Sequence, residues 1–502
     1  MTDKKKRIVK YTILGATLFV AVLLANISKW YAITLGTTFN ELVYTFILPN
    51  TNSNTDIVLN AFKYCCPPTV AVTLTYVVLA ILDFKFYLNE NIREKLFGTK
   101  EKIKFVEIFR KTVATLCTLT IITCSCFILA AFDVTGYLAD KFTSTYIYEN
   151  YYVEPDDVDI TADGKSKNLI YIYLESMENT YASLDEGGIQ DQNLIPNLTT
   201  LAKNNISFSN TEKLGGAIPL YGATWTVGAL FATSTGVPLN FPLNADSLNL
   251  SESFAAGITT LGDILEKKGY NQEFLCGSDA AFGARDTFFK QHGNYKIFDY
   301  FEAINKGYIA EDYFEWWGFE DKILYDIAKN ELLTLASQNK PFNFTMLTVD
   351  THFVEGYVCS DCPSIYEDNT GNIISCADKK VYEFVEWCKK QDFYKDTVIV
   401  IVGDHPRMDT LRVENAEFSD RTMYNCFINS DKNTNFTKNR QFTQVDMFPT
   451  VLSAMGFNIE GNRLGLGTDL FSQEKTLAEI MGFDVLNDEV AKSSSFYNKN
   501  FS

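Results

Sequence analysis

Three long apolar stretches constrain the fold of this chain more than any other feature of its sequence. They run from Tyr11 to Ser28, from Cys65 to Leu82 and from Thr112 to Phe132, and none contains a charged residue. A helix needs about 20 residues to cross the hydrocarbon core of a bilayer. We therefore predict a membrane domain over residues 1–133, with transmembrane helices at about 11–33, 64–84 and 111–132.

Basic residues beside these stretches predict their orientation. Lys and Arg gather before the first stretch, in MTDKKKRIVK, and again between the second and third, in residues 83–111. Short loops rich in Lys and Arg stay on the cytoplasmic side of a membrane. We expect a multi-pass cell-membrane protein with a cytoplasmic N-terminus, and three crossings then place everything after Phe132 outside the cytoplasm.

The rest of the chain is predicted to hold one large domain. Residues 134–162 show no regular hydrophobic period, so we expect a juxtamembrane linker along the membrane surface. The domain would cover residues 163–485, and the polar residues 486–502 would form a loose tail. The chain has 44 basic and 62 acidic residues, a formal net charge of −18. This balance argues against a nucleic-acid partner, because phosphate backbones need clustered Lys and Arg.

Apolar strand patterns alternate with amphipathic helical patterns in this domain. Candidate strands are residues 168–175, 343–349 and 396–404, and helical patterns such as 258–269 and 321–337 lie between them. Continuous apolar strands separated by helices indicate an α/β domain with a mostly parallel central sheet covered on both faces. In such folds ligands bind beyond the carboxyl ends of the strands.

Carboxylates and imidazoles stand at those strand ends. The first strand ends on Glu175, the second runs into Asp350 and His352, and the third ends on Asp404 and His405. Two of the three His residues of the chain therefore follow apolar strands directly. Carboxylates with an imidazole suit a divalent ion such as Mn²⁺, Mg²⁺ or Zn²⁺. We predict a metal site at this edge of the sheet.

A Gly-rich segment, residues 215–239, contains a candidate nucleophile. Thr224 and Thr226 lie where the segment becomes helical. A hydroxyl there would have a metal ion and a positive helix end nearby, and both favour attack on a bound phosphate. A Thr at a helix start can equally be an N-cap. The segment alone leaves both interpretations open.

Cys359, Cys362 and Cys376 lie close together in the sequence. In an oxidising compartment they could form a disulfide that staples the loop. A zinc ribbon is the alternative, but it uses four ligands at paired spacing, and this cluster offers three Cys with no nearby His. We therefore favour a disulfide of unspecified connectivity.

Six segments, taken in order, resemble one enzyme family. They are NLIYIYLESMENTY, GATWTVGALFATSTGVPL, GSDAAFGARDTFFKQHG, DTHFVEGYVC, VIVIVGDH and FTQVDMFPTVLSAMGFNIEGNRLGLGTDLF. Together they resemble the lipoteichoic acid synthase and phosphoglycerol transferase family, membrane members of the alkaline phosphatase/sulfatase superfamily. The resemblance covers nearly the whole chain. It implies N-terminal transmembrane helices followed by an alkaline phosphatase/sulfatase-like domain.

The resemblance also implies a role for each candidate residue. The metal ligands would be Glu175, Thr226, Asp404 and His405. Thr226 would also be the nucleophile, with Thr224 as the reserve choice. The residues that bind the transferred phosphate or glycerol group would be His352, Arg285 and Phe282.

The activity implied by this resemblance is transfer that depends on one divalent ion, Mn²⁺ before Mg²⁺ or Zn²⁺. A phosphoglycerol-type group would move from a phospholipid such as phosphatidylglycerol to an extracytoplasmic glycan, glycolipid or growing polymer through a phospho-threonine intermediate. The alternatives are a phosphoethanolamine transferase and a sulfatase-like phosphodiester hydrolase. A true sulfatase is disfavoured, because residues 163–502 contain no Cys/Ser-x-Pro-x-Arg motif.

Overall fold

A computed structural model describes residues 3–34, 55–88, 101–162, 164, 166–240, 253–417 and 420–501. Within these residues the chain folds as two compact units, one that runs to Tyr137 and one that begins at Leu138. Residues 35–54 and 89–100, which carry part of the charge pattern used to predict orientation, lie outside the described residues.

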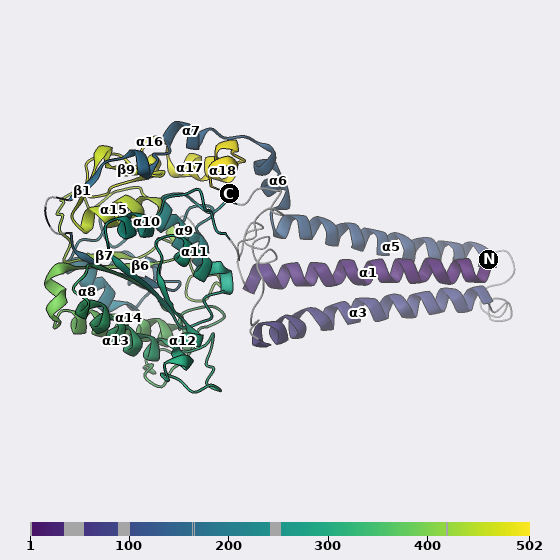
Figure 1. The fold of residues 1–502 in the computed structure, drawn as a ribbon. Coiled ribbons are helices and arrows are strands. Elements are labelled where there is room, and N and C mark those ends of the chain that lie inside the picture. Colours follow the sequence, from purple (N-terminus) through teal and green to yellow (C-terminus); the bar gives the residue numbers. More distant parts are fainter. Residues whose placement is uncertain are drawn as a thin grey trace. The chain divides into compact units, whose positions relative to one another are not determined.

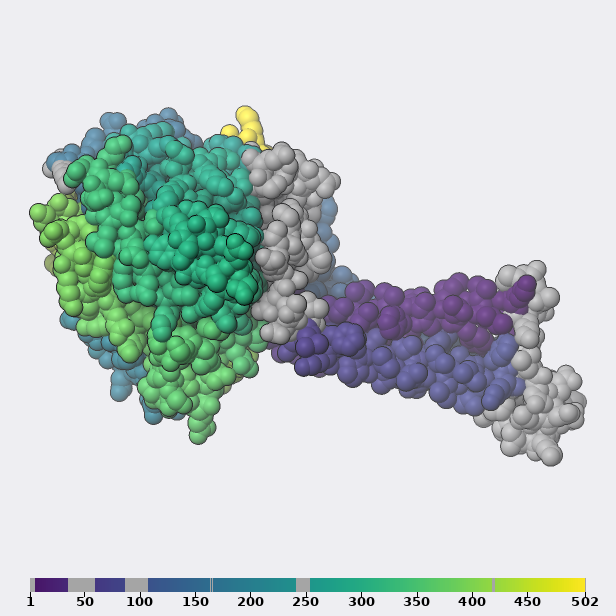
Figure 2. Space-filling view, turned by 60° about the horizontal axis from the view of Figure 1, so that its bottom comes forward, coloured from purple at the N-terminus to yellow at the C-terminus, as the bar shows by residue number. Residues whose placement is uncertain are grey.

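Three long helices form the first unit: α1 (Asp3–Thr34), α3 (Thr55–Leu88) and α5 (Glu101–Ala131). Each contains a segment long and apolar enough to cross a membrane, as the predicted fold class requires. Helices α1 and α3 lie side by side (Figure 2). Tyr76 Oη donates to Tyr11 O at 2.7 Å, and Asn26 Nδ2 donates to Thr69 Oγ1 at 3.1 Å. Such interhelical hydrogen bonds stabilise helix pairs where lipid offers no polar partner.

A six-stranded sheet organises the described part of the second unit (Figure 1). Its strands, in spatial order, are β4 (Lys296–Phe298), β3 (Asn271–Cys276), β5 (Phe342–Leu347), β2 (Asn168–Leu174), β6 (Thr397–Gly403) and β7 (Asn425–Ile428). The first five are parallel, and β7 pairs antiparallel with β6. The mostly parallel sheet is confirmed, and the three predicted strands match β2, β5 and β6 to within two residues.

The two faces of this sheet bury two separate apolar cores. Along β2, Leu169, Tyr171 and Tyr173 enter one core, and the alternate residues Ile170, Ile172 and Leu174 enter the other. This alternation follows from the two-residue repeat of a strand. Because both faces are covered, the strand reads as a continuous apolar run in the sequence.

Helices cover both faces of the sheet (Figure 1). The first core includes residues of α7 (Ile147–Tyr151), α9 (Thr226–Thr235), α10 (Leu261–Lys267), α11 (Arg285–Gln291), α15 (Met447–Ala454), α16 (Leu477–Met481), α17 (Phe483–Ala491) and α18 (Ser495–Asn500). The second includes residues of α8 (Pro196–Asn204), α12 (Tyr300–Asn305), α13 (Asp321–Ser337) and α14 (Asn369–Cys388). Two short antiparallel ladders pair β1 (Ile160–Ala162) with β8 (Phe457–Ile459), and β9 (Arg463–Leu464) with β10 (Gly467–Thr468).

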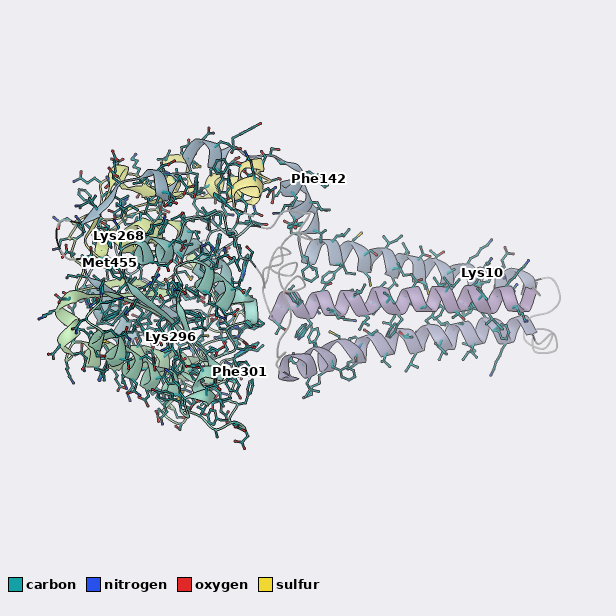
Figure 3. All side chains as sticks on the ribbon, viewed as in Figure 1. Lys10, Phe142, Lys268, Lys296, Phe301 and Met455 are labelled. Atoms are coloured by element: carbon teal, nitrogen blue, oxygen red, sulfur yellow. The ribbon has the colours of Figure 1, made fainter. Side chains whose placement is uncertain are left out.

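The sequence patterns missed strand β3 and the edge strand β4. Glu273 lies in the middle of β3 and is buried, which breaks the apolar run that marks a covered strand. Its carboxylate is paired with Lys296 Nζ on β4, labelled in Figure 3, and the same ammonium bonds Glu331 Oε2 on α13 at 2.6 Å. The buried Glu273 carboxylate is tolerated because Lys296 on β4 pairs with it, a contact that only the tertiary structure reveals.

The predicted linker and tail are not irregular in the structure. Residues 134–162 contain α6 (Val134–Phe142), α7 and β1, and the β1 strand pairs with β8. Residues 483–500 contain α17 and α18, and Tyr497 and Phe501 are buried in the first core. Tyr148 from the expected linker packs edge-on against Tyr497 at a ring separation of 5.3 Å. The prediction of a loose tail was wrong because its few aromatic residues bury their rings.

The predicted disulfide is also absent from the described residues. Cys359, Cys362 and Cys376 do cluster, but all three thiols are free. Their Sγ atoms are 3.6 Å apart for Cys359 and Cys362, and 3.8 Å apart for Cys359 and Cys376. These separations are well beyond the S–S bond length of about 2.05 Å.

Candidate metal and phosphate site

Parallel pairing in the centre of the sheet brings two carboxylates together. Strands β2 and β6 pair in a register that sets Leu174 opposite Gly403. Glu175 and Asp404 are the next residues of each strand, so they leave the sheet side by side. His405 follows Asp404 directly. All three residues therefore lie at the carboxyl edge of the sheet, which is where ligands bind in this fold class.

The candidate ligands converge on one small volume. One ligand atom each from Glu175, Asp404 and His405 lies within 4.8 Å of the others. His405 Nε2 is 3.2 Å from Glu175 Oε1 and 3.4 Å from Asp404 Oδ2. Thr226 Oγ1 completes the group, at 3.3 Å from Glu175 Oε2 and 3.2 Å from His405 Nε2. The structure thus brings together all four residues that the sequence predicted as ligands.

The electrostatics of this cluster favour a cation at its centre. Burial alone would raise the pKa of Glu175, but the charges of His405 and His352 lower it to about 2. Burial and the neighbouring Glu175 raise the pKa of Asp404 to about 8. Burial alone would lower the pKa of His405, but Asp404 and Glu175 raise it to about 10. Two buried carboxylates therefore compete for the same positive charge, and a divalent ion would satisfy both.

Two details of the donor set fit a metal ion. Asp404 Oδ1 accepts hydrogen bonds from the backbone N–H groups of Ser176 and His405, whereas its buried Oδ2 has no hydrogen-bond partner within the described residues. His405 Nδ1 lies 2.8 Å from Pro406 O, and since a carbonyl only accepts, Nδ1 carries the hydrogen. This fixes Nε2 as the ring atom that can bind a metal. Carboxylate, imidazole and hydroxyl donors are typical of Mn²⁺, Mg²⁺ and Zn²⁺ sites.

Neighbouring residues fix the orientation of Glu175. Ser176 has a left-handed backbone (φ 52°), and its Oγ donates to Glu175 Oε1 at 2.9 Å. The Glu175 backbone N–H donates to Thr348 Oγ1 at 3.0 Å, and Thr351 Oγ1 donates to Glu175 O at 2.5 Å. Thr348 and Thr351 could not be identified from the sequence as site residues, because they contact Glu175 from a distant part of the chain.

Thr226 is the first residue of helix α9. The N-cap residue is Trp225, whose side chain makes no capping hydrogen bond. The interpretation of Thr226 as an N-cap is therefore wrong, because an N-cap lies outside the helix and its side chain accepts from the helix backbone. Its hydroxyl instead faces Glu175 and His405. Thr224 lies two residues before the helix.

A pocket opens beside these groups, with a volume of about 50 Å³. That is several times the space that one water molecule needs, so the pocket suits a small polar group such as a phosphate. Five of the predicted site residues line it: Glu175, Thr226, Phe282, Arg285 and His352. Asp404 and His405 lie behind the wall, fully buried.

Arg285 is held rigidly at the pocket. Its Nε donates to Phe282 O at 2.9 Å, and its Nη2 donates to Ser278 Oγ and to Asp279 O at 3.0 and 2.7 Å. The guanidinium carbon lies 5.8 Å from the centre of the Phe282 ring. A fixed, planar guanidinium is well suited to bind phosphate oxygens.

His352 and Trp317 also line the pocket. Burial lowers the pKa of His352, and its Nδ1 lies 2.7 Å from Phe353 O, so Nδ1 carries the hydrogen. The Trp317 ring is 4.9 Å from the His352 ring and 5.9 Å from the Phe282 ring. Its buried Nε1 has no hydrogen-bond partner among the residues described. From the sequence alone, Trp317 could either cover the pocket or touch the membrane surface, and the structure places it in the lining of the pocket.

The second unit of the chain matches a known protein family. A model of the Sulfatase family matches residues 167–457. Phosphoglycerol transferase I from Escherichia coli (strain SMS-3-5 / SECEC) is 31% identical over 346 residues, which cover 65% of this chain and 43% of that protein. The enzyme of the same name from Salmonella choleraesuis (strain SC-B67) is 30% identical over 337 residues, covering 66% and 42%. The chain thus spans less than half the length of these curated relatives.

A solved structure gives the comparison of folds. The lipoteichoic acid synthase LtaP from Listeria monocytogenes superposes with a TM-score of 0.50 at 20% identity, over 64% of this chain and 82% of that chain. The likeness supports the same α/β fold.

Proposed function

Since the chain belongs to the Sulfatase family, we propose that it is a membrane-anchored, metal-dependent phosphotransferase. It moves a phosphoglycerol-type group from a phospholipid such as phosphatidylglycerol to a glycan, glycolipid or growing polymer outside the cytoplasm. The observation that carries this proposal is the position of the Thr226 hydroxyl. It lies within 3.3 Å of Glu175 and His405 and lines one pocket with Arg285 and His352.

One divalent ion, with Mn²⁺ the first choice, would be held by Glu175, Thr226, Asp404 and His405. Two observations support this assignment. Asp404 Oδ2 has no hydrogen-bond partner in the described structure, and the hydrogen on His405 Nδ1 leaves Nε2 available to a metal ion. Such an ion would lower the pKa of the Thr226 hydroxyl and offset charge on the phosphate oxygens.

The transfer proceeds in two displacements at phosphorus. In the first, Thr226 Oγ1 forms a bond to the phosphorus of the lipid head group, and the phosphorus–oxygen bond to diacylglycerol breaks. The Thr226 hydroxyl loses a proton and the departing diacylglycerol oxygen gains one. In the second, a hydroxyl of the acceptor loses its proton and attacks phosphorus, and Thr226 leaves with its hydroxyl restored. Each step conserves the phosphodiester, so no external energy source is needed.

Three pocket residues have distinct roles in these steps. Arg285 binds phosphate oxygens through its fixed guanidinium. His352 carries hydrogen on Nδ1, so its Nε2 accepts the proton of the entering hydroxyl and returns a proton to the leaving oxygen. Trp317 offers its unpaired indole N–H to an oxygen of the head group, and Phe282 packs against the glycerol carbons.

The same proposal places the N-terminus in the cytoplasm and the second unit outside. The exposed aromatic and apolar side chains that follow α5 support contact with a membrane surface. Leu138, Phe142 and Tyr146, spaced four residues apart along and after α6, are 40%, 80% and 67% exposed, and Phe142 is labelled in Figure 3. Side chains of this kind are enriched where a protein meets the interface of a bilayer.

A turnover assay with defined lipids tests the proposal. The full chain in detergent would receive phosphatidylglycerol, phosphatidylethanolamine or a sulfate ester, each with Mn²⁺, and release of diacylglycerol or sulfate would be followed. We expect diacylglycerol from phosphatidylglycerol, loss of activity in Thr226→Ala and retention in the matched control Thr224→Ala. Turnover of phosphatidylethanolamine alone would make the chain a phosphoethanolamine transferase. Full activity of Thr226→Ala would overturn the assignment of the nucleophile.

A further inference from the structure

A second cluster of metal-binding side chains lies apart from the group around Glu175. Cys359 and Cys362 belong to the segment after β5, and Cys376 lies on α14. Their three Sγ atoms are all within 4.8 Å of one another. Cys359 and Cys376 are buried, and Cys362 is half-buried. Two parts of the chain therefore form the cluster, and two of its three cysteines are shielded from bulk solvent.

The spacing of these sulfur atoms matches shared coordination. Zinc–thiolate bonds are about 2.3 Å long, and in a tetrahedron two such sulfur atoms stand about 3.8 Å apart. The measured separations of 3.6 and 3.8 Å fall on this value. Two cysteines in a disulfide would pair at about 2.05 Å and leave the third thiol unused.

Charge at the cluster also suits thiolates. Lys380 follows Cys376 by one helical turn of α14, and its Nζ lies 3.1 Å from Cys359 Sγ and 2.8 Å from Asp350 Oδ2. A divalent ion would offset two of the three thiolate charges, and the ammonium, which is shared with the Asp350 carboxylate, would offset part of the third. Lys380 is itself buried, so its charge is only weakly screened by solvent.

We propose that Cys359, Cys362 and Cys376 bind one thiophilic divalent ion, of which Zn²⁺ is the representative, with a water molecule as the fourth ligand. This site is distinct from the carboxylate and imidazole site in its donor atoms as well as its position. Thiolates select zinc-like ions, whereas oxygen-rich sites suit Mn²⁺ and Mg²⁺. One chain can therefore hold two different ions.

The bound ion would fasten the segment that carries His352 to helix α14. Asp350 accepts hydrogen bonds from Lys380 Nζ and, through its backbone carbonyl, from the Tyr357 N–H at 2.7 Å. His352 lies two residues after Asp350 and lines the phosphate pocket. The thiolate site is thus a structural cross-link behind one wall of that pocket, and it does not touch the reacting groups.

Metal analysis of the full chain in detergent tests this site. The Glu175→Gln background removes a ligand from the other site, so that the remaining zinc reports the cysteines. We expect about one zinc per chain in Glu175→Gln and loss of most of it when Cys359→Ser and Cys376→Ser are added. Cys388→Ala is the matched control, because this buried cysteine of α14 lies outside the cluster, and its zinc content should stay unchanged.

A measurement without cysteine variants keeps the test independent of folding. Cobalt exchanged into the Glu175→Gln chain should show a thiolate-to-cobalt charge-transfer band, which an oxygen and nitrogen site lacks. Peptide mass analysis after alkylation without reduction should find all three cysteines alkylatable once a chelator is added. No charge-transfer band, or a disulfide between any two of the three cysteines in the purified chain, would overturn the proposal. Neither result would bear on the role of Thr226.

Discussion

Replacement of Asp404 by Asn should separate metal binding from folding. The Asn side chain keeps an oxygen in place of Oδ1, so the hydrogen bonds from the backbone N–H groups of Ser176 and His405 can persist. The negative charge is lost, and an NH₂ group replaces Oδ2, the atom that has no hydrogen-bond partner in the described structure. The change therefore removes a metal ligand at little cost in backbone contacts.

Two opposing charge effects set the stability of the metal-free variant. At an effective dielectric constant of about 20, repulsion between Glu175 and Asp404 across at most 4.8 Å is worth at least about 3.5 kcal/mol, and Asn relieves it. Attraction between Asp404 and the protonated His405 ring at 3.4 Å is worth about 5 kcal/mol and is lost. Above about pH 8, where Asp404 is ionised, the difference predicts a decrease of at most about 1.5 kcal/mol in the free energy of unfolding.

The response to metal should change far more. At an Mn²⁺ concentration of 100 times the dissociation constant, binding stabilises the wild-type protein by about 2.7 kcal/mol. Loss of one anionic ligand should weaken binding by about 100-fold, so the same concentration would stabilise Asp404→Asn by only about 0.4 kcal/mol. Calorimetric titration of Mn²⁺, with unfolding followed in detergent with and without the ion, measures both quantities.

Asp378→Asn is the matched control for this experiment. Asp378 is buried on α14 and accepts hydrogen bonds from Asn197 and Leu198, so its replacement should cost stability but leave the full Mn²⁺ response. If Asp404→Asn bound Mn²⁺ as tightly as the wild type, the assignment of the site would be refuted.

Three further predictions address the pocket, the metal site and the tail. Arg285→Lys should lower kcat/KM by roughly 10- to 100-fold, since one charge-assisted hydrogen bond to phosphate is worth about 1.5–3 kcal/mol; steady-state kinetics at wild-type levels would contradict this role. Asp404 and Glu175 outweigh burial and raise the pKa of His405 to about 10, so Mn²⁺ must displace a proton below that pH. The apparent affinity for Mn²⁺ should therefore rise by up to tenfold per pH unit between pH 7 and 9, and titrations in this range should detect the released proton; a flat profile would argue against His405 as a ligand. Tyr497→Ala should destabilise the second unit by about 3–5 kcal/mol, because the buried ring packs on Tyr148 and its hydroxyl donates to Pro238 O at 3.0 Å; denaturant unfolding that matches the wild type would mean that the tail does not pack as described.

The central part of the site could be predicted from sequence because its positions follow a simple rule. Strands β2 and β6 are covered on both faces, so each appears as an apolar run, and the acid that ends each run is conspicuous. Parallel pairing of the two strands then places Glu175 beside Asp404, and this follows from the backbone register alone. The fold class was also predictable, because strands covered on both faces appear as apolar runs that alternate with amphipathic helices.

Other features depend on contacts that a linear pattern does not contain. Trp317 reaches the pocket from a loop in which Trp316 has a left-handed backbone (φ 58°), a local geometry with no periodic signature. Strand β3 was hidden by Glu273, whose charge is balanced by Lys296 on the neighbouring strand β4. The tail looked polar, yet Tyr497 and Phe501 supply enough apolar area to fix it against the core.

The most direct test of the account is a search for the covalent intermediate on Thr226. The full chain would react with phosphatidylglycerol and Mn²⁺, be quenched in acid and be digested for peptide mass analysis. The account predicts a glycerol-phosphate adduct on Thr226 that is absent from Thr226→Ala and present in Thr224→Ala. An adduct on Thr224, or release of diacylglycerol with no adduct on either threonine, would contradict it.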